Sequence, residues 1–301
     1  MSHDRHLAAL GRWKACGPAE VMSLVRRHPD LGLATRTLAA NSLALAQQDR
    51  ALASVFKDAG RYVVAMWAFY LDAGEGLTLP RLKAVCAQSG LLSPGRARAL
   101  LQFLEHLGYV TPQSRGPSGA ATAYDLTPAF RSAWQAQLRA ALEGARRLEP
   151  AVGLLLDRLH EPAILKAFER VHAGGLLASA AQRPIPLTPP FVRVFMHPHA
   201  GLLVLFVLLT CSEDEAFPPR RAGPVSLAAL ARRFAVSRIH LKRLFDEAER
   251  QGLARLGPDG YVVFEPGVGE ALRFFYANQM AQMISAAAAV LDEADGIVRA
   301  A

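Results

Sequence analysis

The side chains best suited to chemistry in this sequence are four cationic or titratable residues in one short stretch. They are Arg238, His240, Lys242 and Arg243. Acidic residues follow them only later, at Asp246, Glu247 and Glu249. Lys and Arg bind phosphate oxygens and base edges, and a helix that reads nucleic acid leads with its N-terminal part. This order of charges therefore favours binding of a polyanion.

Two short helices are predicted to position these side chains. The apolar residues of the first recur at the spacing of one helical face, at Leu227, Leu230, Ala231 and Phe234. The second repeats that spacing at Leu241, Leu244, Phe245 and Ala248. Ser226 and Ser237 directly precede the two helices and fit as their N-caps. The basic stretch is thus the beginning of the second helix.

A β-hairpin is predicted after the second helix. Gly252 fits the end of that helix, and the runs 253–256 and 261–264 flank a turn rich in Gly and Pro. Helix, short turn, helix and hairpin are the order of a winged helix-turn-helix. Residues 225–264 resemble the DNA-binding module of bacterial winged-helix regulators of the MarR and GntR kind. The resemblance implies that the second helix enters the major groove and that Arg255 in the wing reaches phosphate or the minor groove.

The chain is interpreted as written twice from Val55 onward. Residues 93–108 parallel 237–252, and residues 77–82 parallel 225–230. The second helix of the first copy offers fewer cations than its counterpart. Its candidate DNA-binding residues are Arg96, Arg98 and Gln102, with Arg115 in the wing.

The fold class expected from this repeat is mainly α, with small β-hairpin wings. Two tandem winged helix-turn-helix domains would be joined by a helical body in a pseudo-two-fold arrangement. Residues 1–50 are expected to be an N-terminal helical extension, and residues 51–150 the first domain with a trailing helix. Linking helices and a Pro-rich linker would occupy 151–190. The second domain with its trailing helix would occupy 191–301.

The composition agrees with a nucleic-acid partner. The 301 residues carry a formal net charge of +8, with a sequence pI of about 9.8, which suits a polyanionic partner. Three scattered cysteines, Cys16, Cys86 and Cys211, lack the spacing of a metal site or a disulfide framework, as is typical of a cytoplasmic protein. The apolar run 201–209 is too short to span a bilayer, so we expect a core helix and no membrane partner.

The expected function is a transcription regulator that binds specific sequences of double-stranded DNA as a single-chain pseudo-dimer. No cofactor or metal is expected, and the sequence lacks the nucleophile elbow, Walker A, Rossmann and His-Glu zinc-helix motifs, so we expect no enzyme. A plasmid-type replication initiator and a protein-interaction scaffold remain alternatives. Homodimerisation of the chain is left open, as is a small-molecule effector among the aromatic residues Trp67, Trp134, Phe274, Phe275 and Tyr276.

Overall fold

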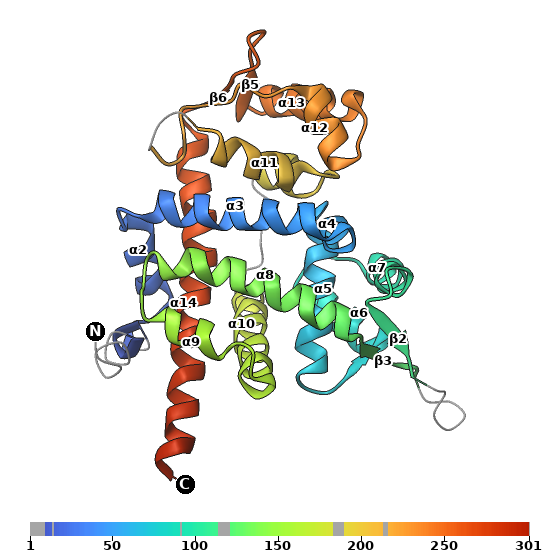
Figure 1. Cartoon of the computed structure of the whole chain (residues 1–301), viewed down its shortest axis with the longest axis vertical. Helices are drawn as coiled ribbons and strands as arrows, with labels where there is room; N and C mark the ends of the chain where they lie inside the picture. Colours follow the sequence, from blue (N-terminus) through green and yellow to red (C-terminus); the bar gives the residue numbers. More distant parts are fainter. Residues whose placement is uncertain are drawn as a thin grey trace.

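The computed structural model of the chain describes residues 10–13, 15–90, 92–113, 121–182, 190–212 and 216–300. Most of these residues are helical, and two small three-stranded antiparallel sheets lie at separate places on the molecule (Figure 1). The mainly helical fold class with small β-hairpins is therefore confirmed. Among the described helices, none combines the length and the apolar composition needed to cross a bilayer.

The first sheet belongs to a segment that we call the first unit. Its elements are α5 (Ala59–Asp72), β1 (Leu77–Thr78), α6 (Leu79–Gln88), α7 (Pro94–His106), β2 (Val110–Pro112) and β3 (Ala123–Leu126). The strands are ordered β1-β3-β2, all antiparallel, with Leu77 opposite Tyr124 and Val110 opposite Leu126. Thr78 and Ser93 cap α6 and α7 by accepting hydrogen bonds from main-chain N–H groups.

The second unit has the same order of elements. They are α11 (Gly201–Thr210), β4 (Arg221–Ala222), α12 (Leu227–Phe234), α13 (Arg238–Arg250), β5 (Ala254–Leu256) and β6 (Val262–Phe264). Its strands are ordered β4-β6-β5, which is the order of the first unit again. Both predicted helices and the hairpin are present, and the hydroxyls of Ser226 and Ser237 accept hydrogen bonds from main-chain N–H groups as N-caps. Strands β1 and β4 are only two residues long and were not predicted.

Further helices surround and connect the two units. They are α2 (Pro18–Arg27), α3 (Leu31–Gln48), α4 (Arg50–Phe56), α8 (Pro128–Arg146), α9 (Val152–Arg158), α10 (Pro162–Gln182), the π-helix η1 (Val192–Met196) and α14 (Val268–Ala300). α8 and α14 are the trailing helices predicted after the two wings, and α9 and α10 are the predicted linking helices. The Pro-rich linker falls mostly outside the described residues.

The N-terminal helices are not a peripheral extension, contrary to the expectation from the sequence. α3 lies in the middle of the molecule, between α11 and α8 (Figure 1). It can do so because apolar and small residues, among them Leu31, Ala34, Leu38 and Ala39, are buried on more than one face. Burial on two sides gives this helix a larger hydrophobic contribution than a surface helix would have.

The packing of the flanking helices is reciprocal between the two halves of the chain. The first half of the chain ends after α8, and the second half begins with α9. In the first half, α3 packs on the trailing helix α8 of that half and on α11 of the second half. In the second half, α10 packs on its own trailing helix α14 and on α5 of the first half. The shorter helices also cross over, since α2 packs on α14 and α9 packs on α8. The structural repeat thus begins well before Val55 and includes the N-terminal helices.

One glycine marks the place where the central helices approach most closely. A Cβ atom added to Gly144 of α8 would lie 2.9 Å from the main-chain oxygen of Ala34 in α3. It would also lie 3.1 Å from Cε of Met280 in α14. A larger residue at this position would meet the main chain of α3, whereas the flexible end of Met280 could move, so Gly144 sets the close spacing of α8 and α3.

Candidate nucleic-acid interface

Helix α13 buries one face in the second unit and exposes the other. Leu241, Leu244, Phe245 and Ala248 are buried, as their spacing predicts. Arg238, Lys242 and Arg243 lie on the exposed side. Arg250, in the last turn, is exposed as well but pairs with Glu247, so the positive charge without an acidic partner is concentrated in the N-terminal half of the helix.

Two of these cations are unengaged. The side chains of Arg238 and Arg243 make no hydrogen bond or ion pair with any residue that the structure describes. Nζ of Lys242 lies 2.7 Å from a carboxylate oxygen of Asp246, one turn further along the helix. Both partners are exposed, and such a pair contributes only about 0.3–0.5 kcal/mol. A phosphate could therefore replace Asp246 at little cost.

His240 does not face outward, contrary to its prediction as a DNA contact. Its Nε2 lies 2.7 Å from the main-chain oxygen of His199, and because a carbonyl only accepts, this nitrogen must carry the proton. Residues 197–200 form a bend and a turn before α11, with Ala200 at a φ of 66°. His240 thus ties the beginning of α13 to the beginning of α11.

The sheet of the second unit adds one free cation beside α13. Arg255 of β5 is paired in register with Val263 of β6, which is in turn paired with Arg221 of β4. Arg221 is engaged, because its guanidinium lies 2.8 Å from Asp259 and 3.6 Å from the ring centroid of Tyr261. The side chain of Arg255 is exposed and forms no hydrogen bond or ion pair with the described residues. It is therefore available to a ligand, as predicted.

The first unit presents a less basic surface. The guanidinium of Arg96 lies 3.2 Å from Asp58, so this candidate is engaged in an ion pair, although its side chain is still 47 % exposed. Arg98 and Gln102 are exposed on α7 and make no hydrogen bond with the described residues, while Arg115 lies outside those residues. In strand register, the position of Arg255 is occupied here by Thr111. Arg98 is thus the only free candidate cation among the described residues of α7.

Arg96 and His240 occupy the same place in the two units. Each is the third residue of its helix, and each holds the chain just before the first helix of its own unit, through Asp58 and His199 respectively. These two anchor points are themselves joined, since the N–H of Ala200 donates to the main-chain oxygen of Lys57 at 2.6 Å. We call this cluster the junction. It links the beginnings of α7 and α13 through one continuous set of contacts.

The junction is electrostatically positive around His199. Burial, together with the charges of Arg61 and Lys57, holds the pKa of His199 below its usual value of 6.5. Asp58 offsets these cations, with Arg61 Nε at 3.3 Å and Arg96 at 3.2 Å from its carboxylate. The same carboxylate caps α5 by accepting a hydrogen bond from the N–H of Arg61 at 2.9 Å.

We expect the Asp58→Ala substitution to lower the free energy of unfolding by about 1–2 kcal/mol, the usual cost of losing a helix cap. Asp58→Asn should recover most of this loss because Asn caps helices as well as Asp does. Glu75→Ala is the control, since Glu75 is an exposed partner of Arg81. Urea denaturation measures all three. Equal destabilisation by Ala and Asn would show that the ion pairs, and not the cap, dominate.

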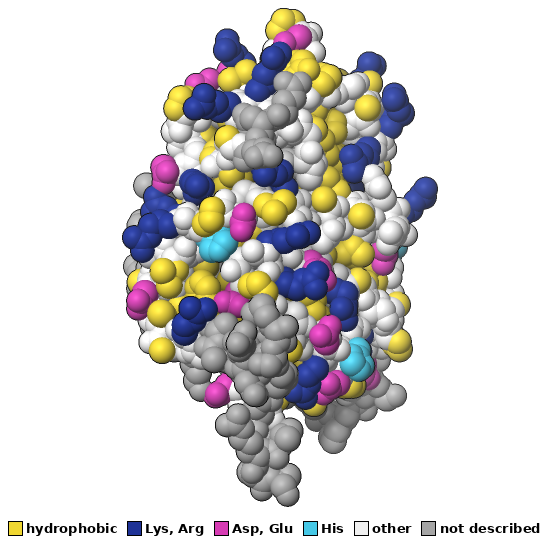
Figure 2. Space-filling view, turned by 60° about the vertical axis from the view of Figure 1, so that its left-hand side comes forward, with side chains coloured by type: hydrophobic (Ala, Val, Ile, Leu, Met, Phe, Trp, Pro, Cys, Tyr) yellow, Lys and Arg dark blue, Asp and Glu magenta, His cyan; other side chains and the backbone are white. Residues whose placement is uncertain are grey.

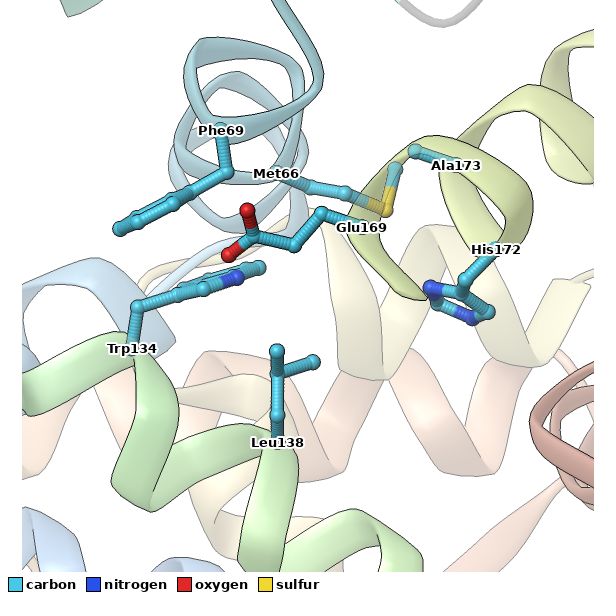
Figure 3. A pocket seen from close by; sticks show the side chains of 7 residues that line it. All are labelled: Met66, Phe69, Trp134, Leu138, Glu169, His172 and Ala173. Carbon is cyan, nitrogen blue, oxygen red and sulfur yellow. The ribbon is translucent and has the colours of Figure 1, made fainter. Parts of the chain in front are cut away.

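The aromatic residues considered for an effector do not form an open pocket with one another. Trp67 and Tyr276 are buried in the core, and Phe274 is exposed. Trp134 lines a cavity of about 10 Å³ between α5, α8 and α10, together with Glu169 (Figure 3). This volume holds about one water molecule. The cavity is therefore not preformed for an organic ligand.

The basic side chains do not form one continuous patch on every side of the molecule. Figure 2 shows the side near α2 and α14, where Lys and Arg side chains are dispersed among acidic and apolar ones.

The described residues contain no group of three or more His, Cys, Asp or Glu side chains that could hold a metal ion. Comparisons of the chain with protein-family models, curated proteins and solved structures found no match.

Proposed function

We propose that the protein is a transcription regulator that binds specific sequences of double-stranded DNA through two winged helix-turn-helix units in one chain. The observation that carries this proposal is the exposed beginning of α13, where Arg238 and Arg243 have no partner among the described residues. This helix follows α12 and precedes the hairpin β5–β6, which is the place of a recognition helix. Arg255 on the hairpin would contact phosphate beside it.

The reciprocal packing supports a pseudo-dimer. In a symmetric dimer, each subunit makes to its partner the contacts that the partner makes in return. Here α3 of the first half packs on α11, and α10 of the second half packs on α5. One chain therefore supplies the arrangement that two subunits would otherwise build. Two DNA-reading helices in one chain would dispense with a dimerisation step.

In the proposed mechanism, the two units contribute unequally to DNA binding. Lys and Arg at phosphates supply affinity with a strong dependence on salt. Side chains at the beginning of each recognition helix supply sequence preference. The second unit has free Arg238, Arg243 and Arg255, whereas α7 of the first unit offers Arg98 and Gln102. We therefore infer that the second unit dominates binding and that the first refines it.

Selection from a random duplex library with the full chain tests this function. We expect an asymmetric site with two unlike half-sites, about 10 base pairs apart if both helices address the same side of the DNA. Single mismatches in the half-site of the second unit should cost about 1–3 kcal/mol, and mismatches in the other half-site less. Mobility shifts of the mutated duplexes give these values.

Other outcomes of the same experiment are equally informative. A perfect palindrome would indicate two chains that each use one unit, which contradicts the pseudo-dimer. Footprinting over genomic DNA, as a second experiment, would favour a replication initiator if it found clustered direct repeats near an origin instead of promoter sites. No retardation of any duplex at low salt would contradict DNA binding and favour a protein-interaction scaffold.

A further inference from the structure

An apolar side chain stands exposed in the middle of the proposed DNA-reading surface. Ile239, the second residue of α13, is 64 % exposed. The other exposed large apolar side chains among the described residues lie between 38 % and 43 %, namely Leu24, Leu33, Val263 and Phe274. Single exposed apolar residues are common on proteins. Ile239 differs from them in both its degree of exposure and its position.

The neighbours of Ile239 define what could cover it. Arg238 precedes it and Arg243 lies one turn further along the same helix, and neither is engaged by a described residue. His240 and Leu241 turn inward, toward the junction and the core. A partner that covers Ile239 must therefore be polyanionic around a small apolar group. An ordinary apolar protein surface would leave both guanidinium groups unpaired.

DNA offers that combination in one place. The 5-methyl group of thymine is the apolar feature that a base pair presents in the major groove, between the phosphate backbones. A β-branched side chain on a helix has few rotamers, so Ile239 would meet the methyl group with little loss of conformational freedom. Arg238 and Arg243 would bind phosphate or guanine on either side of it.

The first unit lacks this feature. Its residue at the second position of α7 is Gly95, and a Cβ atom added there would meet nothing within 4 Å. The space in front of α7 is thus open, but no side chain fills it. Contact with a thymine methyl group would distinguish the second unit from the first by chemistry as well as by charge.

We propose that Ile239 is a specificity-determining residue that reads the methyl group of one thymine in the half-site of the second unit. This inference rests on the proposed DNA-binding function. It adds to that function a base preference for thymine, beside the preference for guanine that the Arg residues would give.

The experiment replaces each thymine of the selected duplex, one at a time, by deoxyuridine, which removes only the methyl group. At one position in the half-site of the second unit, the wild-type chain should lose about fourfold in affinity, as expected for one buried methyl group. In the Ile239→Ala variant the same replacement should have no effect, while binding to the deoxyuridine duplex stays close to wild type. Phe274→Ala, another exposed apolar residue on a different helix, is the matched control and should keep the thymine dependence.

Each of the other possible results contradicts either the assignment of Ile239 or the proposed DNA binding. If no thymine depends on its methyl group, or if the dependence persists in Ile239→Ala, the assignment is wrong although DNA binding stands. If the wild-type chain retards no duplex at low salt, the proposed function itself fails, and Ile239 would then be tested as a protein contact. Circular dichroism melting of Ile239→Ala should match wild type, because the side chain is exposed and its removal leaves no cavity.

Discussion

Glu169→Gln should make the stability of the protein less dependent on pH between 6.5 and 8, where the stability of the wild type should fall by about 1–2 kcal/mol. Glu169 lies on α10 and is 4 % exposed. Its Oε1 has no hydrogen-bond partner among the described residues. Figure 3 shows its carboxyl group directed toward Phe69 and Trp134, whose rings stack at 5.2 Å.

Nearby cations do not return the pKa of this carboxyl group to its usual value. Arg131, one of the two cations whose charge acts on Glu169, is bound to Asp72 by two hydrogen bonds of 2.8 and 3.0 Å. Burial first, and then the charge of Asp72, raise the pKa of Glu169 to about 8, against the weaker opposing effects of Arg131 and Lys166. Glu169 is therefore protonated in the folded protein at neutral pH.

The sign of the pH dependence follows from comparison with the unfolded chain. There the pKa of Glu169 returns to 4.5, so between pH 4.5 and 8 the folded state holds a proton that the unfolded state has released. Stability from this group is present at low pH and is lost as the pH rises through 8. His172 acts in the opposite sense, because burial lowers its pKa to about 4 and its stabilising effect is lost as the pH falls below 6.5. Of these two groups, Glu169 is therefore the one that makes the stability depend on pH above 6.5.

Urea titrations of wild type and Glu169→Gln at pH 5, 6.5 and 8 measure this effect. Gln resembles the protonated acid in shape, so the two proteins should differ little at pH 5 and most at pH 8, with the variant more stable. Glu105→Gln is a suitable control, since the side chain of Glu105 is exposed on α7 and forms no hydrogen bond or ion pair with the described residues. Parallel pH profiles for wild type and Glu169→Gln would mean that Glu169 is ionised in the folded protein.

Removing both free arginines of α13 should flatten the dependence of DNA affinity on salt. Each lost phosphate contact lowers the slope of log affinity against log salt by about 0.9, so Arg238→Ala combined with Arg243→Ala should lower it by about 1.8. By the same relation, affinity at 0.15 M salt should fall about 30-fold if both proteins bind equally at 1 M. Fluorescence anisotropy with one selected duplex at several salt concentrations gives both quantities.

A control with the same change in net charge separates local contact from overall attraction. Arg139 and Arg147 are exposed on and just after α8, and neither forms a hydrogen bond or ion pair through its side chain with a described residue. Arg139→Ala combined with Arg147→Ala should leave the slope close to that of wild type. If both double variants change the slope equally, the effect comes from net charge and α13 is not the binding surface.

The second unit was predictable because its signals are local. Ser226, Ser237 and Gly252 mark where helices begin or end, and the apolar spacing between them identifies the buried faces. Strand β4 gave no such signal, since a strand of two residues shows no alternation, and Arg221 was missed with it. Local patterns thus gave the helices and the hairpin but not the full sheet.

The orientation of the candidate residues needed the structure. Arg96 and His240 have the residue types of DNA contacts, yet both are held by the chain that precedes the first helix of their unit. Their equal position in the two copies was the available hint, because a polar residue repeated at one place can be structural. The role of α3 was also missed, since the repeat was interpreted as beginning at Val55, although α3 and α10 pack equivalently.

The exchange of helices between the halves constrains how the protein can be made. α3 leaves the ribosome early, but α11, against which it packs, is synthesised much later in the chain. Until then, the buried residues of α3 have no complete partner surface, and exposed apolar surface in a growing chain invites aggregation or chaperone binding. Neither half can finish folding before the other is translated, so a ribosome that stops near residue 150 would release a chain with an incomplete core instead of a smaller folded protein.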